Sequence, residues 1–95
     1  MAKGYLIARI KVNDPDGFEE FKKMSGPAIA DHGGRVLVRN PSVEHREGSS
    51  EGLAIVIEFD SLDQARAFYE SEAYTAARLV REKVSDTDLV LVEGV

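Results

Sequence analysis

Apolar and polar residues alternate along residues 3–12, and this period of two predicts a β-strand. The apolar face carries Leu6, Ala8, Ile10 and Val12, and the mixed face carries Tyr5, Ile7, Arg9 and Lys11. We therefore expect the strand to lie against a core through its first face, with the second face open to another contact.

The next segment has the features of a helix start. Asp14 is a good N-cap, and Pro15 suits the first helical position because its missing N–H has no partner there in any case. Phe18, Phe21 and Met24 follow at three-residue spacing. This spacing predicts a helix with one buried stripe.

Gly26 and Pro27 are predicted to interrupt that helix, since a proline ring clashes with the preceding turn. A short second piece over residues 28–32 is expected to end at Gly33 and Gly34, where glycine can adopt the left-handed cap conformation.

The middle of the chain predicts two or three strands. Residues 35–39 alternate, with Val36 and Val38 on one face and Arg35, Leu37 and Arg39 on the other. After a turn at Asn40-Pro41-Ser42, the segment Val43–Glu47 is interpreted either as a short strand or as hairpin decoration. Residues 53–59 form the strongest strand, and their near-continuous apolarity implies that both faces are covered.

The second helical region begins after Ser61, which forms a capping box with Gln64. Ser71 is expected to cap a restart of the helix. The apolar positions of the region are Leu62, Ala65, Phe68 and Tyr69, followed by Ala73, Ala76, Ala77, Val80 and Val84. A last strand is predicted over residues 86–93.

This order of elements is the ferredoxin-like α+β plan, in which both helical regions pack on one face of an antiparallel sheet. The opposite face carries Tyr5, Ile7, Leu37, Ala54 and Val56. An exposed apolar patch of that extent usually marks an interaction surface, and a second copy of the same sheet is the simplest cover. We therefore predict a homodimer.

The composition of the chain limits the kinds of molecule that it is expected to bind. The 95 residues make one domain, residues 1–95. The net charge of −5 disfavours nucleic acid and anionic lipid as partners. There is no cysteine, which excludes disulfides and thiolate chemistry, and no apolar window is long enough for a membrane span. A cytoplasmic protein is the default expectation.

Glu58 is the one carboxylate set into the strongest strand. If its face lines a cavity, loss of water would raise its pKa toward that of a useful general base. The alternative is an ion pair with Arg35 or Arg39, because a charge held there without a partner would be costly. Arg39 is expected as the partner, or as a bidentate clamp for a substrate anion.

Histidine and tyrosine supply the remaining candidates. His32 adjoins a helix end, where a cationic imidazole is stabilised by the helix dipole; the alternative is an acid–base role at a cavity rim. His45 is too far along the chain from it to predict a metal site. Tyr5, Tyr69 and Tyr74 are interpreted as packing residues or as ligand contacts.

Together these segments resemble the domain of unknown function 1330 family, within the dimeric α+β barrel superfamily. The resemblance is carried by Gly4-Tyr5, Asp14-Pro15, His32-Gly33-Gly34-Arg35 with Leu37-Val38-Arg39, Ile57-Glu58-Phe59, residues 68–74 and Val92-Glu93-Gly94. It implies the fold and a dimer. The superfamily includes cofactor-independent monooxygenases, isomerases and haem enzymes, so the resemblance leaves the chemistry and any cofactor open.

Two classes of function follow. The first is a small-molecule enzyme, similar to a cofactor-independent oxygenase or isomerase, with its site in the barrel cavity. Glu58 or His32 would be the base, and Arg39, Tyr5, Tyr69 and Tyr74 would contact the substrate. The second is a non-catalytic dimeric module that binds a small organic ligand or has a regulatory role.

Overall fold

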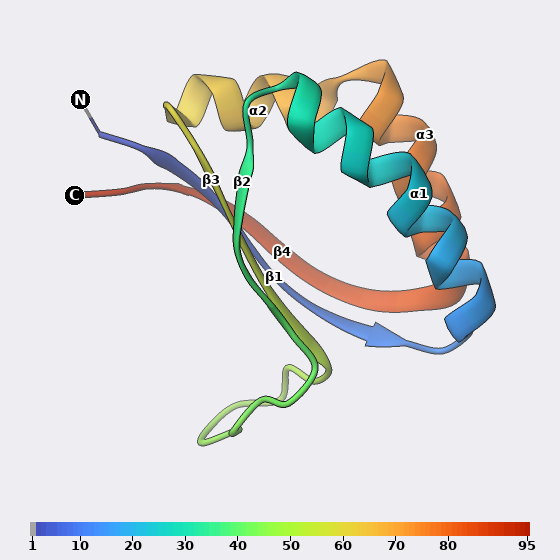
Figure 1. Cartoon of the computed structure of the whole chain (residues 1–95). Helices are drawn as coiled ribbons and strands as arrows, with labels where there is room; N and C mark the ends of the chain where they lie inside the picture. Colours follow the sequence, from blue (N-terminus) through green and yellow to red (C-terminus); the bar gives the residue numbers. More distant parts are fainter. Residues whose placement is uncertain (1) are drawn as a thin grey trace.

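The computed structural model describes residues 2–95 as a four-stranded antiparallel sheet covered on one face by three helices (Figure 1). The elements are β1 (Gly4–Val12), α1 (Pro15–Asp31), β2 (Arg35–Asn40), β3 (Leu53–Phe59), α2 (Leu62–Glu70), α3 (Glu72–Val84) and β4 (Ser85–Glu93). The strand order is β2-β3-β1-β4. This is the ferredoxin-like α+β fold, as the pattern predicts.

The helices begin at the predicted caps. The side chain of Asp14 accepts a hydrogen bond from the backbone N–H of Gly17, and Ser61 and Ser71 do the same for Gln64 and Tyr74. Each cap satisfies one of the donors that a helix start leaves without a partner. At the other end of α1, Gly33 takes a φ of 71°, the left-handed conformation expected there.

The predicted interruption at Gly26 and Pro27 is wrong, because α1 runs unbroken from Pro15 to Asp31. Both residues are exposed, and so is Lys23, whose carbonyl loses its helical donor at the proline. Water can hydrate that carbonyl. The buried stripe of the helix passes on the other side and includes Phe18, Phe21, Ser25 and Ala28. Burial of this stripe outweighs the local cost of the proline.

The segment after β2 also differs from one of the expectations. Val43–Glu47 forms no strand, and residues 41–52 make an irregular loop that extends away from the sheet (Figure 1). The pairing of β2 with β3 contains a β-bulge between Val36 and Val38. Arg35 pairs with Glu58 before the bulge, whereas Arg39 pairs with Ile55 after it.

The core lies between the sheet and the helices. Phe59 and Phe68 are fully buried, and Phe68 stacks between Phe59 and Tyr74 at centroid distances of 5.2 and 4.5 Å. Phe18 and Phe21 belong to the same cluster. The predicted packing of the aromatic stripes under the sheet is therefore confirmed.

The opposite face of the sheet carries exposed apolar side chains. Ile7 on β1 is 41% exposed, and it pairs with Val56 on β3 and Val90 on β4. Val38 and Val92 are also exposed. We call Ile7, Val38, Val56, Val90 and Val92 the outer apolar patch. Within residues 2–95, no helix has the length and apolarity needed to cross a membrane.

Candidate functional site

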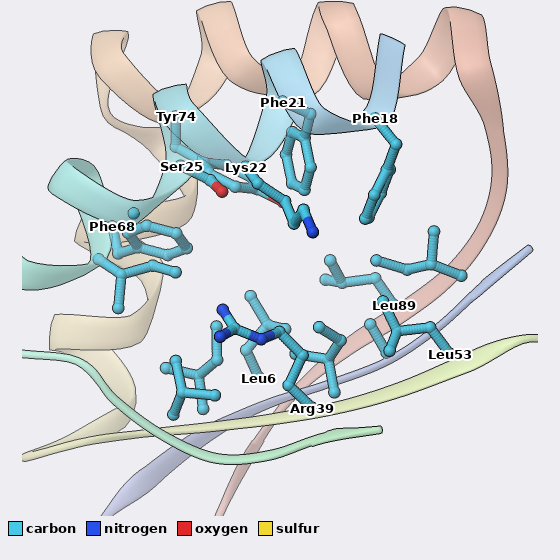
Figure 2. A pocket seen from close by; sticks show the side chains of 17 residues that line it. Leu6, Phe18, Phe21, Lys22, Ser25, Arg39, Leu53, Phe68, Tyr74 and Leu89 are labelled. Atoms are coloured by element: carbon cyan, nitrogen blue, oxygen red, sulfur yellow. The ribbon is translucent and has the colours of Figure 1, made fainter. Parts of the chain in front are cut away.

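A cavity of about 70 Å³ lies between the helix-facing side of the sheet and α1 (Figure 2). One water occupies about 10–15 Å³ on the same scale, so the cavity exceeds the size of a single water several times over. Four aromatic side chains contribute to its wall, namely Phe18, Phe21, Phe68 and Tyr74. Sites for small organic molecules have walls of this kind and usually enclose about 300–1,000 Å³, so this cavity suits a molecule of only a few non-hydrogen atoms.

Two cations are the only charged residues that line this cavity in the described chain: Arg39 from β2 and Lys22 from α1. Figure 2 shows both side chains extending into the space between the strands and α1. Lys22 also pairs with Glu19 one turn earlier, at 2.8 Å. Within residues 2–95, Arg39 has no ion pair within 4.0 Å, so no carboxylate of the described chain neutralises its guanidinium.

Arg39 reaches this cavity because of the β-bulge. The strict alternation expected for β2 places Arg35 and Arg39 on the same face. The extra residue in the bulge, Leu37, shifts the alternation by one position. Arg39 therefore joins the helix-facing side with Ile55, and it is not the partner of Glu58 that the sequence predicts.

Behind the cavity wall, Tyr74 contacts a buried guanidinium. Nη1 of Arg81 donates a hydrogen bond of 2.6 Å to the hydroxyl of Tyr74, and Arg81 is only 5% exposed. Its guanidinium carbon also lies 5.9 Å from the ring centroid of Phe21, a cation–π distance. Burial is the main cause that raises the pKa of Tyr74, so its hydroxyl stays protonated at neutral pH.

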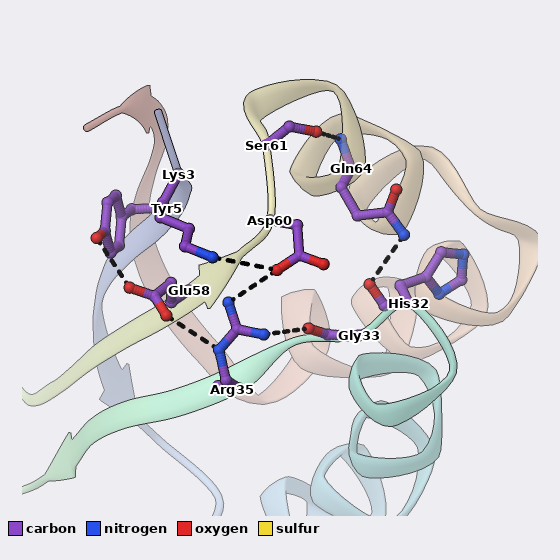
Figure 3. Close-up of polar contacts among 9 residues, drawn as sticks. All are labelled: Lys3, Tyr5, His32, Gly33, Arg35, Glu58, Asp60, Ser61 and Gln64. Carbon is purple, nitrogen blue, oxygen red and sulfur yellow. Dashed lines mark hydrogen bonds and ion pairs between the residues drawn. The ribbon is translucent and has the colours of Figure 1, made fainter. Parts of the chain in front are cut away.

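Glu58 lies on the other face of the sheet, in a polar network at one end of the strands (Figure 3). The hydroxyl of Tyr5 donates to Oε2 of Glu58 at 2.9 Å, and Nε of Arg35 donates to Oε1 at 3.0 Å. Arg35 also reaches Asp60 at 3.2 Å, and Lys3 pairs with the same carboxylate at 3.4 Å. A guanidinium beside Glu58 is thus confirmed, with Arg35 in place of Arg39.

This network holds Glu58 as an anion. The hydrogen bond from Tyr5, followed by that from Arg35, lowers the pKa of Glu58 below its ordinary value of 4.5. The same hydrogen bond raises the pKa of Tyr5 above 10.0. In the single chain the pKa of Glu58 is therefore lowered, and not raised toward that of a general base, because donors outweigh the loss of water around a side chain that is still 21% exposed.

We expect Glu58→Gln to lower the stability of the protein slightly at neutral pH, because it removes the charge paired with Arg35. A depressed pKa contributes stability that is present above the unfolded-state pKa and is lost as the pH falls through the folded-state pKa. The free energy of unfolding of the variant should therefore fall less than that of the parent chain as the pH drops below about 5. Urea unfolding between pH 3 and pH 7 measures this difference.

Glu82→Gln is the matched control, because Glu82 pairs with Arg78 on the surface of α3 at 2.9 Å. Surface pairs of this kind contribute little. If both variants show the same pH profile as the parent chain, the Glu58 network has no role in stability.

The remaining predicted residues lie apart from both groups. His32 is the C-cap of α1, and its Nδ1 lies 2.8 Å from the carbonyl oxygen of Ala28. Tyr69 packs on Tyr74 at a centroid distance of 5.5 Å, outside the cavity lining. The structure brings together Arg39 and Tyr74 at the cavity, and Tyr5 and Glu58 in the network. Residues 2–95 contain no cluster of three or more histidine, cysteine or acidic side chains suited to a metal ion.

Lys22, Ser25 and Arg81 were missed by the sequence-based prediction. Ser25 lies four residues after Phe21 and seven after Phe18, so helical spacing alone places it on the buried stripe. Arg81 lies seven residues after Tyr74 and follows the same rule. Lys22 lies four residues after Phe18, so the same spacing places it beside the stripe.

Solved structures with the same fold are numerous, at low identity. A protein of unknown function from Rhodopseudomonas palustris is 14% identical, with a TM-score of 0.74 over 99% of this chain and 83% of the other. A dimeric ferredoxin-like protein of unknown function from Thermobifida fusca is 21% identical, with a TM-score of 0.68 over 96% and 90%. SnoaB, a cofactor-independent oxygenase from Streptomyces nogalater, is 15% identical, with a TM-score of 0.67 over 97% and 92%.

No curated protein sequence matches the chain significantly. At these identities the likeness to the solved structures establishes the fold and leaves the chemistry open. The family model described as "Domain of unknown function (DUF1330)" matches residues 3–95, which is nearly the whole chain. The protein therefore belongs to the DUF1330 family.

Proposed function

We propose that this protein is a homodimer that binds a compact, partly apolar organic molecule in the cavity between the sheet and α1. The observation that carries the proposal is the cavity itself, with its aromatic wall and its two cationic side chains. Well-packed cores leave few voids larger than a water molecule, so a cavity of about 70 Å³ among core side chains needs a reason. A ligand site supplies one.

The homodimer is supported by the outer apolar patch and by the dimeric ferredoxin-like neighbours. The patch lies on the face of the sheet opposite the cavity, so two copies can meet through their sheets while both cavities stay accessible from the helix side. Glu58 and Tyr5 lie on this same outer face. Their proposed role is to fix the position of Arg35 there, with no part in ligand chemistry.

Ligand binding can be tested by filling the cavity. Ser25→Leu should reduce the affinity for small organic probes, because Ser25 is buried and lines the cavity. Benzene occupies a cavity of about 150 Å³, so the panel consists of smaller molecules: acetate, acetamide, propionate and propanamide can be titrated into the ¹⁵N-labelled chain and followed by NMR. We expect amide shifts on α1 and β3 in the parent chain and at least about tenfold weaker binding in the variant.

Ala30→Leu is the control, because it adds a larger side chain at an exposed position of the same helix. It should leave binding unchanged. Equal binding by Ser25→Leu and the parent chain would remove the cavity as the site.

A second candidate is that the bound molecule is also turned over by a cofactor-independent oxygenase- or isomerase-like reaction. SnoaB and two proteins described as antibiotic biosynthesis monooxygenases share the fold across at least 97% of this chain, which favours this candidate. Binding probes would be monitored for oxygen uptake without added cofactor and for proton exchange with D₂O. Binding without either change would support the non-catalytic module.

A further inference from the structure

We propose that the ligand of this cavity is an organic carboxylate, whose charge is held by Arg39 together with Lys22, and that the β-bulge at Leu37 directs Arg39 to this task. The inference rests on the proposed function, because it names the chemical class of the ligand for the same cavity. Three features of the structure support it.

The first feature is the sign of the charge around the cavity. The chain is acidic overall, with 17 acidic against 12 basic residues, yet the charged residues lining the cavity are both cations. Within residues 2–95, the one carboxylate within 4.0 Å of either cation is that of Glu19, which pairs with Lys22 but does not line the cavity. An anion entering the cavity therefore meets two positive charges and no lining carboxylate.

The second feature is the bulge. In the regular part of the β2–β3 pairing, Arg35 lies opposite Glu58 on the outer face. The extra residue at Leu37 places Arg39 opposite Ile55 on the helix-facing side. Without it, Arg39 would lie on the outer face beside the apolar patch. Bulges are frequent next to functional sites because they redirect a side chain in this way.

The third feature is the combination of groups that the cavity offers. Figure 2 shows Arg39 rising from the strands and Lys22 descending from α1 into the same space. Lys22 is paired with Glu19 and Arg39 has no ion pair within residues 2–95, so an anion between the two cations would be attracted by both and would meet a guanidinium without a carboxylate partner. A guanidinium binds a carboxylate through two parallel hydrogen bonds, and an ammonium adds a third donor. Phe18, Phe21 and Phe68 form the apolar part that would receive the rest of the molecule.

The test compares each acid with its neutral amide of nearly the same shape. Acetate and propionate, and acetamide and propanamide, would be titrated into the full chain and followed by ¹⁵N NMR at neutral pH. Each acid should bind at least about tenfold more tightly than its amide, because a hydrogen bond to a charged group contributes more free energy than one between neutral groups. A higher salt concentration should weaken the binding of the acids more than the binding of the amides.

Arg39→Gln and Lys22→Gln should each remove most of the preference for the acid while leaving the affinity for the amide nearly unchanged. Lys23→Gln is the matched control, because Lys23 is an exposed neighbour on α1 that does not line the cavity. Arg39→Lys should restore only part of the preference, because an ammonium cannot make the two parallel bonds. Arg39 is exposed, so unfolding curves of these variants should match that of the parent chain.

The possible failures are distinct. If amides bind in the cavity as tightly as acids, the proposed function stands and the carboxylate inference is overturned. If the acids are preferred but Arg39→Gln keeps that preference, the charge is held elsewhere and the inference is again overturned. If no probe shifts the cavity amides, the proposed function fails and the inference fails with it.

Discussion

Phe68→Ala is expected to lower the free energy of unfolding by about 3–5 kcal/mol, the range for emptying a buried aromatic site. Phe68 is fully buried, and its ring contacts Phe59, Tyr74 and the imidazole of His32. It also lines the cavity, so alanine would enlarge a void that already exists. Neighbouring side chains then have little prospect of closing the gap, and the loss should fall near the upper end of the range.

Urea denaturation of the variant and the parent chain measures this loss. Phe68→Leu should recover part of the stability, because leucine fills most of the volume without a polar group. Tyr69→Ala is the neighbouring control; Tyr69 is only half-buried, and its removal should have a smaller effect. A loss below about 1 kcal/mol for Phe68→Ala is the size of an ordinary surface change and would place this ring outside the core.

The fold follows from the sequence because local signals and tertiary packing agree over most of the chain. The caps at Asp14, Ser61 and Ser71 begin helices where the apolar period changes from two to 3.6 residues. At Pro27 the local preference and the tertiary packing disagree. Its helix-breaking tendency is a local preference of a few kcal/mol, and burial of the adjoining helix face outweighs it.

The candidate site is less predictable for a specific reason. The spacing of Arg35, Leu37 and Arg39 predicts that all three lie on one face of a regular strand. Nothing in the residue types of the segment indicates a β-bulge. The bulge is visible only in the pairing with β3. One inserted residue reverses every later side chain, so Arg39 moves to the cavity side, whereas Arg35 lies before the bulge and stays opposite Glu58.

The sequence predicts a cavity on the face of Glu58, and the position of the observed cavity on the helix-facing side could not be predicted from it. The existence of the observed cavity depends on how side chains from all three helices and all four strands fail to fill a common volume, and no single segment contains that information. Sequence analysis led instead to Glu58, the one polar residue in an apolar strand. The structure explains that carboxylate by its two donors, Tyr5 and Arg35.

Ile7→Glu should convert a dimer into monomers, if the outer apolar patch joins two sheets. Ile7 is central to the patch, between Val56 and Val90, and it is 41% exposed in the single chain. In a two-fold symmetric interface the substitution would bury two new carboxylates without partners. A buried unpaired charge costs several kcal/mol, so the dissociation constant should rise by about a hundredfold or more.

Sedimentation equilibrium at micromolar concentration distinguishes the two masses, and the parent chain should give the dimer. Leu79→Glu is the matched control, because Leu79 is 53% exposed on α3, away from the outer face. It should leave the dimer intact. The fold of the Ile7→Glu monomer should persist, because Ile7 lies on the face opposite the core, and far-ultraviolet circular dichroism would report it. Two results would contradict a dimer joined through this face. One is a parent chain that sediments as a monomer at this concentration, and the other is a dimer that Ile7→Glu leaves unchanged. In either case the outer apolar patch would have to bind another partner.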